Sequence, residues 1–160
     1  MRRLLHDLSG VLEETVGLDE AAGFIAVVGQ RMGEWMDRQY RHRLGLKTLS
    51  THDVARVLVD LKARIQGGFS IESVDDERII LANTRCPFGD YVFGRPSLCM
   101  MTSNVFGVIA AENLGYARID LERTIARGDS GCRVVIHLQP DSTSRVDTSG
   151  LLSREYFATR

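Results

Sequence analysis

Residues 83–138 read NTRCPFGDYVFGRPSLCMMTSNVFGVIAAENLGYARIDLERTIARGDSGCRVVIHL and contain all three cysteines of the chain, Cys86, Cys99 and Cys132. Cys86 falls in a loop rich in glycine, proline and aromatic residues. Cys99 falls at the expected start of a helix, and Cys132 at the expected start of the last strand. Three cysteines contributed by three different elements are the best candidate for a chemical site.

The elements of this stretch follow from its pattern. A proline and a serine at positions 96 and 97 favour the start of a helix that runs to Gly115 with an apolar side. Residues 116–126 and 131–138 are typical of two strands joined around RGDSG, which is turn chemistry and not an adhesion motif.

The sequence before this stretch predicts three helices and a hairpin. The helices cover residues 2–16, about 19–43 and about 50–65, the last with a serine or threonine as N-cap. FSIESV and RIILAN form the hairpin around the acidic turn DDE. The order predicts an α+β fold in which N-terminal helices pack on an antiparallel sheet of about four strands.

The longest predicted helix has two notable features. Its large apolar side chains lie on one face, and they are Phe24, Val27, Val28, Met32, Trp35 and Met36. Gly23, Gly29 and Gly33 weaken the helix, by about 1 kcal/mol each relative to alanine, but would permit close approach of a neighbouring helix. Because one small domain does not need so many apolar residues on one helix, we expect a homodimer through the helices of residues 1–66.

Residues 141–160 differ in character. They are polar, rich in serine and threonine and without periodicity, which is typical of a tail or linker. We therefore expect one domain over residues 1–140, and a downstream signalling module after the linker would be no surprise.

Composition limits the function classes. The chain has 160 residues, 44% of them hydrophobic, and a net charge of −1. This balance favours a soluble globular domain and gives no sign of electrostatic capture by nucleic acid or an anionic membrane. Without a signal-type apolar segment or a run of about 18 apolar residues, we expect a cytoplasmic protein.

The cysteines have two interpretations by spacing alone. The first is three reduced, buried thiols that act as small apolar residues. The second is a metal site: three thiolates and one further ligand suit zinc, and three cysteines with an open position suit an iron–sulfur cluster. Candidates for the fourth ligand are Asp90, Glu122, Asp129 and His137, although His137 should face the opposite side of the sheet from Cys132. The helix dipole would favour the thiolate of Cys99.

Several motifs together resemble a known family. GVIAAENLGYARIDLERTIARGDSGCRVVIHL is similar to the C-terminal half of the 4-vinyl-reductase-like domains, in which a helix leads to a strand, an A-x-G-D-x-x-C hairpin and a final strand. The loop RCPFG and the helix start PSLC, together with this stretch, resemble the methanogen output domain more closely. The resemblance covers roughly residues 20–138.

The resemblance implies a function. Vinyl-reductase-like domains are sensor modules of transcription regulators, usually dimeric, with a structural zinc beside a ligand pocket. It implies zinc ligation by Cys99 and Cys132. The usual Glu-x2-Cys positions fall on Leu121 and Thr124 here, so two of the usual ligands are missing, and Cys86 offers a replacement for one of them.

We therefore predict a sensory or signal-transducing domain and not an enzyme, since no cysteine has a histidine with a pairing signature. A small apolar ligand would bind between the long helix and the sheet, lined by candidates Trp35, Met36, Tyr40, Phe93, Met101 and Phe106. Three alternatives stay open: an iron–sulfur redox or gas sensor at the same cysteines, a tetrapyrrole-related enzyme or assembly factor, and a plain dimerisation module.

Overall fold

The computed structural model describes residues 2–140 and 153–159 of the chain. The α-helices in this part are α1 (Arg2–Val16), α2 (Leu18–Leu44), α3 (Thr51–Ala63) and α4 (Pro96–Leu114). The strands are β1 (Phe69–Val74), β2 (Arg78–Asn83), β3 (Tyr116–Arg123), β4 (Cys132–His137) and β5 (Ser153–Phe157). Two short 3-10 turns, η1 (Gly89–Val92) and η2 (Ile125–Arg127), flank the cysteine-bearing elements.

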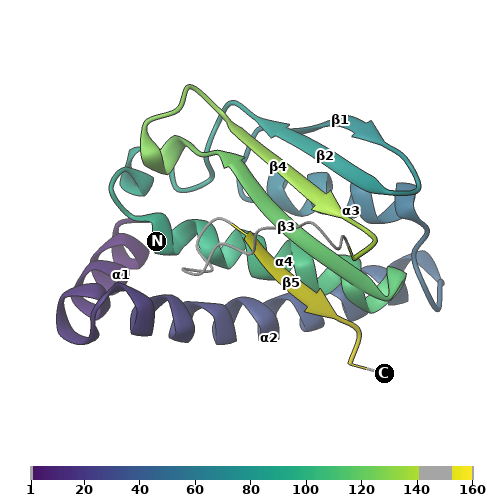
Figure 1. Ribbon diagram of the computed structural model, residues 1–160, viewed down its shortest axis with the longest axis horizontal. Helices are drawn as coiled ribbons and strands as arrows, with labels where there is room; N and C mark the ends of the chain where they lie inside the picture. The colour runs from purple at the N-terminus through teal and green to yellow at the C-terminus, as the bar shows by residue number, and fades with distance from the viewer. Residues whose placement is uncertain (1, 141–152, 160) are drawn as a thin grey trace.

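The strands form one antiparallel sheet in the order β1-β2-β4-β3-β5 (Figure 1). The two predicted hairpins are β1–β2 and β3–β4, and they join through the central pairing of β2 with β4, in which Leu81 lies opposite Val134. The predicted α+β class is confirmed, and the described part of the sheet has one strand more than the expected four.

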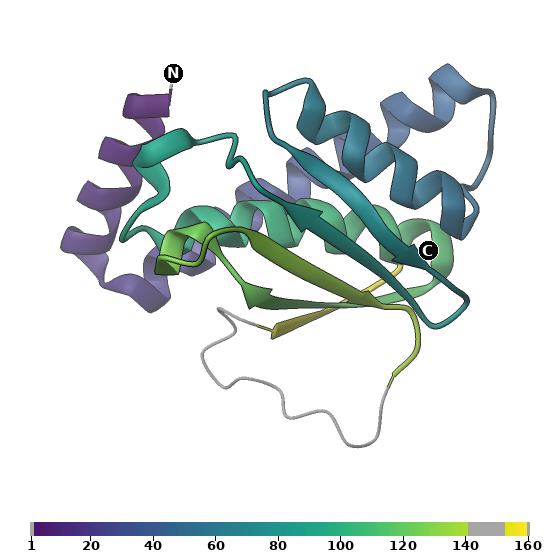
Figure 2. The same ribbon diagram turned by 90° about the horizontal axis from the view of Figure 1, so that it is seen from above.

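The helices are layered on one side of the sheet. Figure 2 shows α4 lying along the sheet, with α3 beside it behind β1 and β2, and α2 beyond α4. Because α4 is covered by α2 on one side and by the sheet on the other, apolar residues surround it. Its buried apolar residues are Leu98, Met100, Val105, Phe106, Val108, Ile109, Ala110 and Ala111.

The packing face of α2 is the small-residue face. A methyl group added at Gly29 would lie 2.7 Å from Cβ of Asn104, and one added at Gly33 would lie 2.9 Å from Cβ of Val108, both on α4. The glycines therefore permit a close approach, but to a helix of the same chain. Small side chains form this packing face because only they leave α4 enough room.

The large apolar side chains of α1 and α2 lie instead on the surface. Eight of the exposed ones are Leu4, Leu8, Val11, Phe24, Val27, Val28, Met32 and Trp35, which we call the α1–α2 apolar face. Met36 is half-buried and packs against the main core. In residues 2–140 and 153–159, no helix combines the length and apolar character needed to cross a membrane.

Helix α3 begins where the sequence predicts and ends slightly earlier. Ser50 is its N-cap, and a reciprocal capping box joins the Ser50 side chain and backbone to Asp53. The helix ends at Ala63, so Ile65, which we placed at its end, lies beyond it and is exposed.

Strand β5 corrects the prediction of a tail for part of residues 141–160. Residues 153–157 pair with β3, and the Tyr156 ring lies where a side chain at Gly107 would be, 2.1 Å from an added methyl group. A five-residue edge strand with one buried side chain has too little hydrophobic pattern to be recognised from the sequence. Residues 141–152 lie outside the described part.

Candidate functional site

The three cysteines have the predicted local positions. Cys86 lies in the loop before η1, Cys99 in the first turn of α4, and Cys132 is the first residue of β4. All three are free thiols of intermediate exposure. The backbone N–H of Ile125 donates to Sγ of Cys132 at 3.5 Å. The thiols are held by three separate elements, each fixed by its own packing.

A residue that the sequence reasoning missed lies among them. Lys62, in the last turn of α3, has a side chain that is only 4% exposed, and it interacts electrostatically with each of the three cysteines. Its Nζ donates to Oγ1 of Thr102 on α4 at 2.7 Å. The Nζ also lies 5.9 Å and 5.3 Å from the ring centroids of Phe69 and Phe106. We call Lys62 and the three cysteines the thiol–lysine centre.

The pKa values of the thiol–lysine centre are those of groups that are buried away from water. Burial lowers the pKa of Lys62 to about 8, while the neighbouring cysteines oppose this shift. Burial raises the pKa of Cys86, and burial together with the adjacent Cys132 and Cys86 raises the pKa of Cys99 to about 12. The expected dipole-stabilised thiolate at Cys99 is thus outweighed by desolvation, because Cys99 is packed between two apolar clusters.

The arrangement of the thiols bears on the predicted metal site. Across residues 2–140 and 153–159, no three histidine, cysteine, aspartate or glutamate side chains are placed so that they could hold a metal ion. The thiols are soft donors of the right kind, but in this arrangement they do not form a ligand set. Zinc and an iron–sulfur cluster therefore remain predictions.

Three of the four candidate fourth ligands have other partners. Nε2 of His137 lies 2.8 Å from Asp120, Glu122 pairs with Arg133, and the Asp129 carboxylate accepts from the backbone N–H of Thr124 at 2.7 Å. His137 lies on the opposite side of the sheet from Cys132, as the strand alternation predicts. The fourth candidate, Asp90, lies in η1, four residues after Cys86.

The six predicted pocket residues are separated by the fold. Trp35, Met36 and Tyr40 line one groove, between α2 and the end of α3. Met101 lines a second groove among α1, α2 and α4, while Phe106 is fully buried and Phe93 is exposed. We predicted a pocket between α2 and the sheet, but α4 fills that space.

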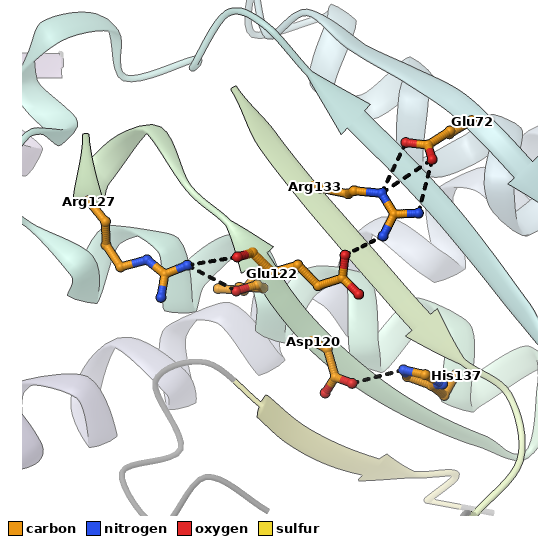
Figure 3. A network of polar contacts seen from close by, with 7 residues as sticks. Glu72, Asp120, Glu122, Arg127, Arg133 and His137 are labelled. Atoms are coloured by element: carbon orange, nitrogen blue, oxygen red, sulfur yellow. Dashed lines mark hydrogen bonds and ion pairs between the residues drawn. The ribbon is translucent and has the colours of Figure 1, made fainter. Parts of the chain in front are cut away.

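The sheet face turned away from α4 carries a polar network (Figure 3). Arg133 on β4 pairs with Glu72 across β2 and with Glu122 on the neighbouring β3. Asp120 accepts from His137 and, at 2.5 Å, from Ser153. Burial tends to raise the pKa of Asp120, but these hydrogen bonds and a nearby arginine lower it to about 2.

The signal for Lys62 was present in the sequence. Ala55, Leu58 and Lys62 follow one another at spacings of three and four, which places the lysine on the apolar stripe of α3. A lysine is so often exposed that its place on this stripe does not by itself predict burial.

Comparisons with known proteins agree with this fold. None of the curated proteins matches the chain. Among solved structures, the chain is similar to a trafficking protein particle complex subunit 3 from Naegleria fowleri covalently bound to palmitic acid. The TM-score is 0.57 at 13% identity, covering 87% of this chain and 95% of the other, which shows a shared fold. The family model described as methanogen output domain 1 matches residues 4–137, and the chain therefore belongs to that 4-vinyl-reductase-like family of output domains.

Proposed function

We propose that this chain is a signal-transducing regulatory domain, not an enzyme, and that its responsive part is the thiol–lysine centre. Membership of an output-domain family supports the regulatory role. The observation that carries the assignment of the centre is that three thiols from three elements interact electrostatically with one buried ammonium group.

The physical basis is the low polarity around Lys62. A charge in a dry interior interacts much more strongly with its neighbours than a charge in water. Any event that gives the thiols negative charge, or removes them, therefore changes the interaction energy of Lys62. Such events include deprotonation, oxidation and binding of a soft cation. Since Lys62 and Thr102 join α3 to α4, the change is passed to both helices.

A bound metal is one form that this response takes in the proposal. Zinc binding by Cys86, Cys99 and Cys132 would require these side chains to move into a common ligand set, and the Lys62 ammonium would then offset the excess negative charge of three thiolates. An iron–sulfur cluster at the same cysteines is the alternative, and visible absorption would distinguish the two, because zinc is colourless.

The output would pass through a homodimer. The α1–α2 apolar face supports this, because it leaves eight large apolar side chains exposed on two adjacent helices. In a two-fold dimer the same apolar face of each copy would be covered by that of the other.

The test compares wild type with Cys132→Ser and Lys62→Gln, prepared without oxygen. Metal content, melting temperature and the emission of Trp35, the single tryptophan, are measured before and after addition of zinc and, separately, of hydrogen peroxide. We expect a shift in melting temperature or emission in wild type, loss of it in Cys132→Ser, and a smaller shift in Lys62→Gln.

Lys47→Gln is the matched control, because Lys47 is the other lysine of the chain and is exposed. It should respond as wild type does. If Cys132→Ser and wild type behave alike under both treatments, the cysteines are inert core residues and the proposal fails.

A further inference from the structure

A groove lies between α2 and the end of α3, and we call it the α2–α3 groove. Its volume is about 210 Å³. Trp35, Met36, Tyr40, Leu61 and Ile65 form most of its surface, and Trp35 and Ile65 are 55% and 48% exposed at its sides. Drug-sized ligands occupy pockets of about 300–1,000 Å³, so this groove suits a smaller molecule with an apolar body.

The rim of the groove carries an excess positive charge. Asp60 accepts from the Tyr40 hydroxyl at 2.6 Å and from Nε of Arg64 at 2.7 Å, so these three groups satisfy one another. The guanidinium of Arg43 lies 6.0 Å from the centre of the Tyr40 ring. Arg43 also interacts electrostatically with Asp60, so two arginines share one carboxylate at this rim. One positive charge at the groove is therefore in excess and can attract an incoming anion.

We propose that the α2–α3 groove binds a small apolar monocarboxylate, with the apolar body on Trp35, Leu61 and Ile65 and the carboxylate on Arg43. The guanidinium group of arginine matches the planar carboxylate and can donate two parallel hydrogen bonds. The excess positive charge at the rim favours an anionic occupant over an uncharged one.

This site lies directly behind the thiol–lysine centre. Leu61 lines the groove, and the next residue, Lys62, points into the interior toward the cysteines. A molecule that fills the groove would fix the last turn of α3, and with it the position of the Lys62 ammonium. The inference rests on the proposed function in this respect, because the groove would be an input to the same centre.

The experiment is a titration that follows the emission of Trp35, using the full chain at a fixed, low concentration. The probes are benzoate and hexanoate, with benzyl alcohol and hexanol as their neutral analogues. We expect the emission to change saturably with at least one carboxylate. The corresponding alcohol should bind with a dissociation constant at least about ten-fold higher, because it lacks the charge-assisted hydrogen bond. The two carboxylates distinguish an aromatic from an aliphatic ligand.

Arg43→Gln should weaken binding of the carboxylate about ten-fold and leave the alcohol unchanged. Arg31→Gln is the matched control, since Arg31 is an exposed arginine of α2 that does not line the groove. Equal affinity for acid and alcohol, no effect of Arg43→Gln, or no saturable change with either acid would overturn the inference. So would a Trp35 signal that depends on protein concentration alone, because a second copy would then fill the groove.

Failure here can be separated from failure of the proposed function. If zinc or peroxide still shifts the melting temperature of wild type while no carboxylate binds, only the groove assignment is lost. If carboxylates bind but neither treatment acts through Cys132, the groove stands as a binding site and the responsive centre is rejected.

Discussion

The two faces of the sheet differ in the partners of their charged side chains. On the face turned away from α4, Arg133 has Glu72 and Glu122, and Asp120 has His137. On the face covered by α4, Lys62 interacts with a threonine hydroxyl, two aromatic rings and three thiols, and in the part of the chain that the structure describes no carboxylate pairs with it.

This difference shows where a charge lowers the stability of the fold. Exposed ion pairs contribute little to stability because water screens them. A buried ammonium group loses its hydration, and interactions with its neighbours must compensate for the lost free energy. A chain selected for stability alone would place a leucine or methionine at position 62. Its retention of a lysine is consistent with a role for the charge itself.

The largest expected effect is charge reversal at the buried position. Lys62→Glu would place a carboxylate without a cation in the interior, and we expect a loss of about 3–5 kcal/mol in the free energy of unfolding. Urea denaturation at pH 7 under reducing conditions measures it. Arg133→Glu is the matched reversal on the exposed face, and its loss should be much smaller. Equal losses would show that the two faces do not differ in the way described.

The second effect concerns alkaline pH. The pKa of Lys62 is about 8 in the folded chain, below the ordinary 10.5, so above pH 8 the unfolded chain holds more protons at this residue and stability rises with pH. The raised pKa values of Cys86 and Cys99 act in the opposite direction above pH 9, because the unfolded thiols ionise first. We expect a maximum near pH 9, only about 0.3 kcal/mol above the value at pH 8, because the two thiols offset most of the gain from Lys62.

Lys62→Met separates the two contributions. It should remove the rise between pH 8 and 9 and keep the decline above pH 9, because the thiols remain. Denaturation midpoints at half-unit intervals of pH, with reductant present, give the two curves. A rise that persists in Lys62→Met must come from another group.

The smallest effect belongs to the exposed face. The low pKa of Asp120, about 2, means that its stabilisation is complete above pH 4 and is lost as the pH falls toward 2. After allowance for screening at this partly exposed site, the loss is about 1 kcal/mol. His137→Gln should reduce it, as measured by thermal melting between pH 2 and 5. An identical acid profile in wild type and variant would contradict the role of His137.

Much of the fold could be predicted from sequence because its signals are local. The Ser50 capping box, the strands 69–74 and 78–83 and the helix that starts at position 96 each depend on neighbouring residues. The packing face of α2 could not be predicted by hydrophobicity, because the residues that contact α4 are chosen for smallness, as at Gly29 and Gly33.

The site was predicted only in part for a similar reason. The positions of the cysteines on loop, helix and strand follow from local pattern. The presence of Lys62 among them depends on how α3 packs beside α4, which is a tertiary relation. The same holds for β5, whose alternating residues acquire a partner only because β3 presents a free edge.

The packing of the Tyr156 ring against Gly107 affects the order in which the parts of the chain fold. The Tyr156 hydroxyl lies 3.3 Å from Oγ of Ser103, a residue 53 positions earlier in the chain. While a ribosome is still extending the chain, α4 is complete but the recess at Gly107 has no occupant. The sheet edge at β3 and this recess are filled together, so the last closure of the core is a long-range step that follows the local elements.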